Sequence, residues 1–282
     1  MKPARLSWSV GRVGFAKNRR TPNGPVDHDL PTMVVRDAED DTIRGIYLSY
    51  ACHCVTLSDN KISGDWAGFA QAAIEEDHPG AICLTSIGCG SDANPDSGVT
   101  GGRHDIAADQ GDAIRAEVAR LLKRNQKPLE GALRTTLNSI DLPLTEPPSR
   151  EQLAETARQG GPAGYSAQWH LARLDRGEEL MTAIRYPIQS LSFGDDLAML
   201  FLAGEVCVDY AHRLKREFDR DRIWINAYAN DFCSYIPSER LVREGGYGGG
   251  AEMVYFGVPA TLKPGLEQLI VDEVHRQVPR EF

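Results

Sequence analysis

Short apolar runs of strand length alternate along this chain with segments of helical period, and this alternation is what most constrains its fold. Residues 46–51 form an apolar, aromatic run that is expected to be a buried strand. A helix is predicted over 67–77, ending at Pro79-Gly80, and a longer amphipathic helix has apolar residues from Ile106 to Leu122. The pattern predicts an α/β fold, a layered sandwich of mixed β-sheets packed with helices, in a single domain.

The remaining elements extend the same pattern. Further strands are expected at 32–37, 43–51, 81–87, 133–142, 182–193, 197–202 and 223–228, and further helices at 206–218 and 264–278. The polar segment 150–179 is helix-prone and is interpreted as a helical insertion around 150–180. Residues 1–31 contain Pro and Gly and show little periodicity, so they are interpreted as an irregular leader or connection before an α/β domain over 32–282.

Charge and composition narrow the function classes. The 282 residues carry a net charge of −9 without a basic block, which disfavours nucleic acid as a partner, so a small-molecule substrate is expected instead. No apolar stretch reaches membrane-spanning length. The first residues lack the apolar core of a signal peptide, and the six cysteines are dispersed, so a cytoplasmic location is expected.

Cys52-His53-Cys54 follows the apolar run and is the first candidate for chemistry. Two cysteines two apart on a strand point to one side and the histidine to the other, so the three cannot converge on one ion. No second Cys-x-x-Cys pair follows, which disfavours a structural zinc ribbon. His53 alone can be a metal ligand or a hydrogen-bonded core histidine.

Other strand ends also carry polar residues, at the loop 88–95, at Glu205 and over 226–235. In α/β folds such ends gather at one edge, where sites form. Glu205 is expected to open a helix, where the helix dipole favours a carboxylate, and an ordinary helix-start glutamate is the alternative. A cysteine nucleophile, Cys89 or Cys52, is the weakest hypothesis because no histidine can be paired with either from sequence.

Several motifs in order carry a family resemblance. They are Asn18-Arg19-Arg20, the stretch 51–56, Ile62-Ser63-Gly64-Asp65-Trp66-Ala67-Gly68, Leu202-Ala203-Gly204-Glu205, Asn226-Ala227-Tyr228 with 234–238, and Glu244-Gly245-Gly246-Tyr247. Together they resemble the amino-terminal catalytic domain of the neutral/alkaline, non-lysosomal ceramidases, and more closely the shorter bacterial proteins similar to them. Their order, with the spacing of Tyr235 and Tyr247, makes the combination more specific than any single motif.

The resemblance implies a zinc-dependent hydrolase. That family cleaves the amide of N-acylsphingosines with one zinc ion, held by two histidines, a glutamate and a tyrosine. By position, His53, Glu205 and Tyr235 match three of these ligands, Tyr247 a second tyrosine near the metal, and Arg19 an arginine near the substrate. Imidazole, carboxylate and phenolate are suitable zinc ligands.

The implied reaction uses a metal-activated water on an N-acyl, lipid-like amide or on an ester. In it, Arg19 and Tyr247 stabilise the oxyanion, and Asp65 or Asp92 orients groups or accepts protons.

Two departures from the family pattern define the alternative. The family's other zinc histidine lies upstream of the Asn-Arg pair, but no histidine precedes Asn18 here. We expect either a truncated product or completion of the site by His28, His104 or a water. The family's reacting serine falls on Ala93, with Ser91 as a neighbour. The alternative is therefore a catalytically inactive, ceramidase-like binding protein.

Overall fold

The computed structural model of the protein describes residues 2–278 and 282, and most of its strands lie in two sheets. The first sheet has the order β5-β4-β3-β1-β7, and only β4 and β5 run parallel in it. Its strands are β1 (Ala4–Arg12), β3 (Asp29–Asp37), β4 (Ile43–Tyr50), β5 (Ile82–Ile87) and β7 (Lys127–Pro128).

The second sheet has the order β12-β10-β9-β8. At its centre β9 and β10 pair antiparallel, and β12 joins β10 in parallel. Its strands are β8 (Leu133–Pro143), β9 (Ala183–Phe193), β10 (Leu197–Leu202) and β12 (Ile223–Asn226).

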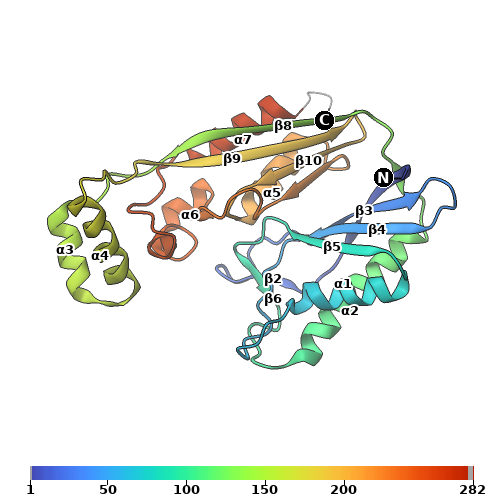
Figure 1. The fold of residues 1–282 in the computed structure, drawn as a ribbon, viewed down its shortest axis with the longest axis horizontal. Coiled ribbons are helices and arrows are strands. Elements are labelled where there is room, and N and C mark those ends of the chain that lie inside the picture. Colours follow the sequence, from blue (N-terminus) through green and yellow to red (C-terminus); the bar gives the residue numbers. More distant parts are fainter. Residues whose placement is uncertain (1, 279–281) are drawn as a thin grey trace.

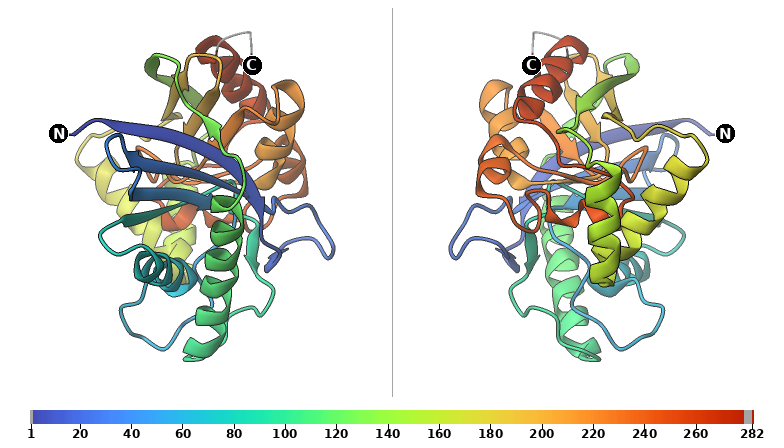
Figure 2. Two further views of the ribbon diagram at one scale, coloured as in Figure 1. Left: turned by 90° about the vertical axis from the view of Figure 1, so that its right-hand side faces the viewer. Right: turned by 90° about the vertical axis from the view of Figure 1, so that its left-hand side faces the viewer.

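The two sheets and four of the helices form four layers, α-β-β-α (Figures 1 and 2). On the outer face of the first sheet, Trp66 and Ile114 from two helices pack against Ile46. The inner faces meet around Trp8 and Trp224. Two further helices cover the outer face of the second sheet. The layer helices are α1 (Asp65–Asp77), α2 (His104–Leu122), α5 (Val208–Glu217) and α7 (Leu266–Gln277). The predicted fold class, a layered α/β sandwich in one domain, is confirmed.

Two short strand pairs bring distant segments together. β2 (Ala16–Asn18) pairs antiparallel with β6 (Ala93–Pro95), and β11 (Glu205–Val206) pairs parallel with β13 (Tyr235–Ile236). After β13 come the short helix α6 (Glu239–Glu244) and the 3₁₀ segment η1 (Ala251–Tyr255). Glu205 and Tyr235 of the candidate site lie on β11 and β13, and Arg19 follows β2.

Helices lie where the insertion around 150–180 was predicted. α3 (Arg150–Gln159) and α4 (Gly161–Asp175) form a helical hairpin between β8 and β9, at one end of the molecule (Figure 1). Ser149 begins α3 with a capping box, in which its hydroxyl accepts from the Gln152 backbone and the Gln152 side chain accepts from the Ser149 backbone.

The prediction that residues 1–31 are irregular is wrong. β1 is a nine-residue strand inside the first sheet, between β3 and β7, and Trp8 from it is buried between the two sheets. The local sequence mixes Ser, Arg and Gly with the apolar residues, so strand periodicity is weak. Pairing with β3 over its whole length stabilises it, and that pairing is invisible in a local window.

No helix in the described part of the chain is both long and apolar enough to cross a membrane.

Candidate active site

His53 and Glu205 form the centre of the candidate site. Nε2 of His53 lies 3.0 Å from Oε2 of Glu205, and both side chains are largely buried. The histidine is held from behind by the backbone. Its own N–H donates to the Ala93 carbonyl at 3.0 Å, and the Trp66 indole donates to its carbonyl at 2.9 Å. The imidazole is therefore fixed in place before any ligand binds.

The contact of Nδ1 with the Ala93 carbonyl orients the His53 ring so that Nε2 faces Glu205. Nδ1 of His53 lies 2.9 Å from the Ala93 carbonyl, and a carbonyl oxygen can only accept, so Nδ1 carries a hydrogen. Nε2 then faces the carboxylate either as a second N–H or as a bare lone pair. A contact of 3.0 Å is attractive only if a proton or a metal cation lies between the two groups. A backbone carbonyl on the other ring nitrogen is also the usual arrangement behind a metal-ligating histidine.

Glu205 is kept ionised by its neighbours. Burial by itself would raise the pKa of Glu205, but hydrogen bonds from His53, Tyr235 and Tyr228 outweigh burial and lower that pKa below its usual value. The site thus presents a charged carboxylate beside His53.

A two-residue parallel bridge aligns Glu205 with Tyr235. The two are direct partners in the register of β11 and β13, and the Glu205 N–H donates to the Ser234 carbonyl at 2.9 Å. Gly204 makes this approach possible, because its φ is +67° and a Cβ there would lie 2.4 Å from that carbonyl. The expectation that Glu205 opens a helix is wrong, since α5 begins at Val208 and Glu205 belongs to β11.

Arg19 joins Tyr235 to Tyr247. Its Nη2 donates to the Tyr235 hydroxyl at 3.0 Å, and its guanidinium carbon lies 5.7 and 5.4 Å from the ring centres of the two tyrosines. The two rings meet edge to face at 5.4 Å. Burial, together with hydrogen bonds to Tyr247 and Glu205, raises the pKa of the Tyr235 phenol. Arg19, Tyr235 and Tyr247 therefore form one cluster beside Glu205.

Tyr228 is a site residue that sequence reasoning missed. Its hydroxyl donates to Oε2 of Glu205 at 3.1 Å and lies 3.2 Å from Nε2 of His53. Burial raises the pKa of this phenol well above its usual value. Tyr228 reaches the pair from a left-handed backbone conformation, φ +55°, stabilised by its N–H donating to the Gly204 carbonyl. The motif Asn226-Ala227-Tyr228 was the available signal, but its turn geometry is not visible in the residues alone.

Asp65 lies behind the histidine, with both carboxylate oxygens occupied. One accepts from the Leu57 N–H and the other from the Trp66 N–H, each at 2.8 Å. It is almost fully buried and fixes the loop between β4 and α1. Through Trp66 it supports the carbonyl of His53.

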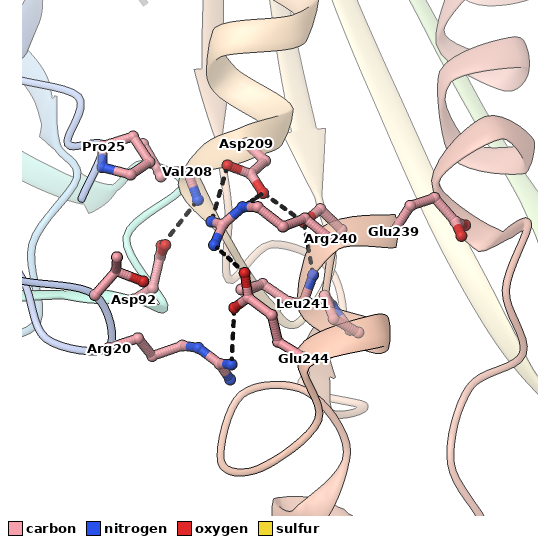
Figure 3. A network of polar contacts seen from close by, with 12 residues as sticks. Arg20, Pro25, Asp92, Val208, Asp209, Glu239, Arg240, Leu241 and Glu244 are labelled. Atoms are coloured by element: carbon pink, nitrogen blue, oxygen red, sulfur yellow. Dashed lines mark hydrogen bonds and ion pairs between the residues drawn. The ribbon is translucent and has the colours of Figure 1, made fainter.

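Asp92 is likewise occupied by donors from the protein. Its carboxylate accepts from the Val208 N–H at the start of α5, 2.9 Å away (Figure 3). It also accepts from the Asn18 amide at 3.0 Å. Burial raises the pKa of Asp92, and these two hydrogen bonds partly offset the rise. Its backbone carbonyl accepts from the Arg19 N–H at 2.8 Å. Asp92 therefore fastens the end of β2, and Arg19 just after it, to helix α5.

Arg20 fixes the glycine-rich loop that carries Tyr247. Its guanidinium donates to the carbonyls of Gly245 and Tyr247 and pairs with Glu244. Figure 3 shows that Glu244 in turn contacts Arg240, which binds Asp209 on α5. A chain of charges thus connects α5 to the loop.

The donor types at this centre suit a zinc ion. His53, Glu205 and Tyr235 supply one imidazole, one carboxylate and one phenol, and three protein ligands with an open position are typical of catalytic zinc sites. Within the described residues, no group of three or more His, Cys, Asp and Glu side chains is placed to hold a metal ion, so an ion at this centre would need the Tyr235 phenol as its third ligand.

The other candidates for completing the site are engaged elsewhere. His28 contacts the Tyr50 hydroxyl, and His104 contacts Asp59 at 2.9 Å. Cys52 is buried and Cys54 exposed beyond the end of β4, so strand alternation does not govern them. Burial raises the pKa of the Cys52 and Cys89 thiols, which disfavours a thiolate nucleophile.

Comparison with solved structures shows the fold. Neutral ceramidase from Pseudomonas aeruginosa superposes with a TM-score of 0.69 at 17% sequence identity, over 96% of this chain and 52% of that one. A structure described as ceramidase complexed with C2 gives a TM-score of 0.69 at 16% identity, over 98% and 54%. The chain thus has a ceramidase-like fold and spans about half the length of these proteins. Neither a protein-family model nor a curated protein matches the sequence.

Proposed function

We propose that the protein is a zinc-dependent hydrolase of the ceramidase-like kind, cleaving an N-acyl, lipid-like amide or an ester. The observation that carries the proposal is the 3.0 Å contact between Nε2 of His53 and the ionised Glu205, with Nδ1 committed to a carbonyl. The ceramidase-like fold supports the same reading.

The proposed ligands are Nε2 of His53, a carboxylate oxygen of Glu205 and the hydroxyl of Tyr235. A zinc ion held there would supply Lewis acidity for a substrate carbonyl and make a water nucleophilic near neutral pH.

The chain's own residues would do the remaining work. Arg19 is always charged and lies beside the Tyr235 hydroxyl, so it is placed to stabilise negative charge developing on a carbonyl oxygen, with Tyr247 as a second donor. Tyr228 donates to Glu205 and holds the carboxylate in its rotamer. Asp65 and Asp92 act as positioning residues, because backbone and amide donors already occupy their oxygens.

Metal content tests the proposal. Elemental analysis of the purified protein should give about one zinc per chain. The His53→Ala variant should lose it, and His104→Ala, a matched control that removes a histidine paired with Asp59 instead of Glu205, should retain it. Zinc-free protein with undiminished turnover would refute the proposal.

A second candidate function is binding without catalysis. Ala93 favours it, since a methyl group stands where the family has its reacting serine, and its carbonyl serves to hold His53. A panel of N-acyl amides and esters separates the two functions. Turnover above the blank that His53→Ala abolishes excludes the binding-only function, and tight binding without turnover supports it.

A further inference from the structure

A cleft of about 410 Å³ is lined chiefly by helices α5 and α6. Its volume is within the range of small-molecule sites. Four arginines and a histidine line it, together with three carboxylates. The chain as a whole carries a net charge of −9, so the excess of basic side chains in this cleft runs against the overall balance of charge.

The carboxylates of the cleft are already engaged by donors from the protein. Nε and Nη2 of Arg240 donate to the two oxygens of Asp209 at 3.1 and 3.2 Å (Figure 3). Glu267 accepts from Arg213 at 2.9 Å and from the Glu239 N–H at 2.8 Å. The carboxylate of Glu239 accepts from a backbone N–H in turn. These pairings account for two of the four arginines.

Arg216 and Arg243 are the two arginines that remain. In the part of the chain that the structure describes, neither guanidinium forms an ion pair or a side-chain hydrogen bond. Arg216 lies on α5 and Arg243 on α6, and both are exposed. His212 precedes Arg216 by one turn on the same side of α5 and also lines the cleft. Free guanidinium groups from two helices therefore line one cleft.

This arrangement of like charges is unfavourable for the two helices. Arg213 and Arg216 are three residues apart on α5, and Arg240 and Arg243 are three residues apart on α6. Like charges at this spacing destabilise a helix. A local feature that opposes stability without a compensating contact is typical of a functional site.

We propose that this cleft binds the phosphate group of a small, water-soluble molecule, with Arg216 and Arg243 as its free donors. The planar fork of a guanidinium matches two phosphate oxygens at once. A phosphate monoester carries close to two negative charges at neutral pH, so it can neutralise both arginines, whereas a carboxylate carries one. The cleft is larger than a phosphate ion and has room for a further part of the ligand.

The lining favours a free molecule over a lipid headgroup. A site on a membrane surface combines basic side chains with apolar or aromatic ones that enter the headgroup region. Among the described residues that line this cleft, Pro25 is the one apolar residue. His53 and Glu205 are not part of the lining, so the proposal is independent of the hydrolase function.

Calorimetric titration of the full chain with inorganic phosphate tests the proposal. The buffer is at pH 7.5 and constant ionic strength, because salt screens exposed charges. We expect saturable binding of about one phosphate per chain, and acetate should bind at least tenfold more weakly. Arg216→Gln and Arg243→Gln should each weaken phosphate binding about tenfold. Arg134→Gln, which removes an exposed arginine on β8, is the matched control and should bind as the wild type does.

Thermal unfolding separates a ligand role of these arginines from a structural one. Without phosphate, Arg216→Gln and Arg243→Gln should unfold at or above the wild-type temperature, because each removes an unpaired charge. Added phosphate should raise the unfolding temperature of the wild type more than that of either variant. A loss of stability in both variants without phosphate would show a structural role and count against the proposal.

Three further results would overturn the proposal. They are the absence of saturable phosphate binding, equal weakening by Arg134→Gln, and binding to phosphatidylglycerol vesicles but not to inorganic phosphate. The titration is repeated with His53→Ala, which should bind phosphate unchanged. Loss of phosphate binding in that variant would place the anion at the His53–Glu205 centre instead of this cleft. Failure of the metal centre and failure of the cleft are thereby separate results.

Discussion

The His53–Glu205 centre and the groove between α4 and η1, which is lined by Tyr165, Trp169 and Tyr255, are built in opposite ways. At the centre, polar side chains are buried and held by backbone groups from several distant segments. At the groove, apolar rings are exposed and come from just two neighbouring elements. The centre therefore depends on exact long-range geometry, whereas the groove depends on apolar area. Substitutions in the two regions should accordingly differ in their effects on stability and activity.

The largest effect is expected from His53→Ala. The variant removes a proposed ligand, so zinc affinity and turnover should fall by more than the roughly 10–100-fold that loss of an outer partner costs. Metal titration and steady-state kinetics check it. An unchanged zinc affinity would show that His53 is not a ligand.

Gly204→Ala should be the next largest. The added methyl meets the Ser234 carbonyl at a backbone angle that disfavours alanine, so we expect a loss of roughly 2–3 kcal/mol in the free energy of unfolding. Gly177→Ala is the control, since its φ is +78° but nothing lies within 4 Å of the new methyl. Denaturant unfolding gives the loss of unfolding free energy for each variant, and the difference between the two losses is the cost of the clash. Equal losses would show that the β11–β13 approach is not tight.

Arg20→Ala should reduce turnover about tenfold, which corresponds to the free energy of roughly one charge-assisted hydrogen bond. Its zinc content should not change. The reason is that Tyr247 loses its fixed loop while the ligands keep theirs. Hydrogen exchange of residues 245–250 should rise in the variant, and Arg134→Ala, an exposed arginine on β8, should leave exchange and turnover unchanged. Unaltered exchange in Arg20→Ala would contradict the role of Arg20 as the clamp of this loop.

The smallest effect concerns pH and a contact outside both regions. Burial alone would raise the pKa of Asp29, but Lys215 and Arg220 outweigh it and lower that pKa below its usual value. A lowered carboxyl pKa contributes stability above the unfolded pKa of about 4, and the contribution is lost as the pH falls through the folded value.

For this partly exposed cluster the contribution is about 1 kcal/mol or less. Unfolding of wild type and Lys215→Met between pH 6 and pH 2.5 measures it. The difference between them should shrink on acidification, and a constant difference would contradict the assignment.

Much of the layered fold was predictable because its strands and helices carry their own periodicity. The strands around 46–51 and 197–202 and the helices α1 and α2 follow from local pattern alone. β1 does not, because what holds it is pairing with β3 and burial of Trp8 against the other sheet.

In the candidate site, too, some features were predictable from the sequence and others were not. The sequence motifs pointed to His53, Glu205 and Tyr235, and the structure brings them together. The bridge that aligns Glu205 with Tyr235 is only two residues long, however, and joins segments thirty residues apart. Two other features are also tertiary. One is the turn that places the Tyr228 hydroxyl against His53 and Glu205, and the other is the set of donors that bind the carboxylates of Asp65 and Asp92. Such features depend on where the chain returns in space, so residue type and spacing could not supply them.

X-ray absorption at the zinc edge of the purified protein reads the proposed ligands directly. We expect a single zinc with nitrogen and oxygen neighbours at about 2.0–2.1 Å, one of them an imidazole, and loss of that imidazole signal in His53→Ala. Sulfur neighbours at about 2.3 Å would instead place the ion on Cys52 or Cys54 and contradict the site described above.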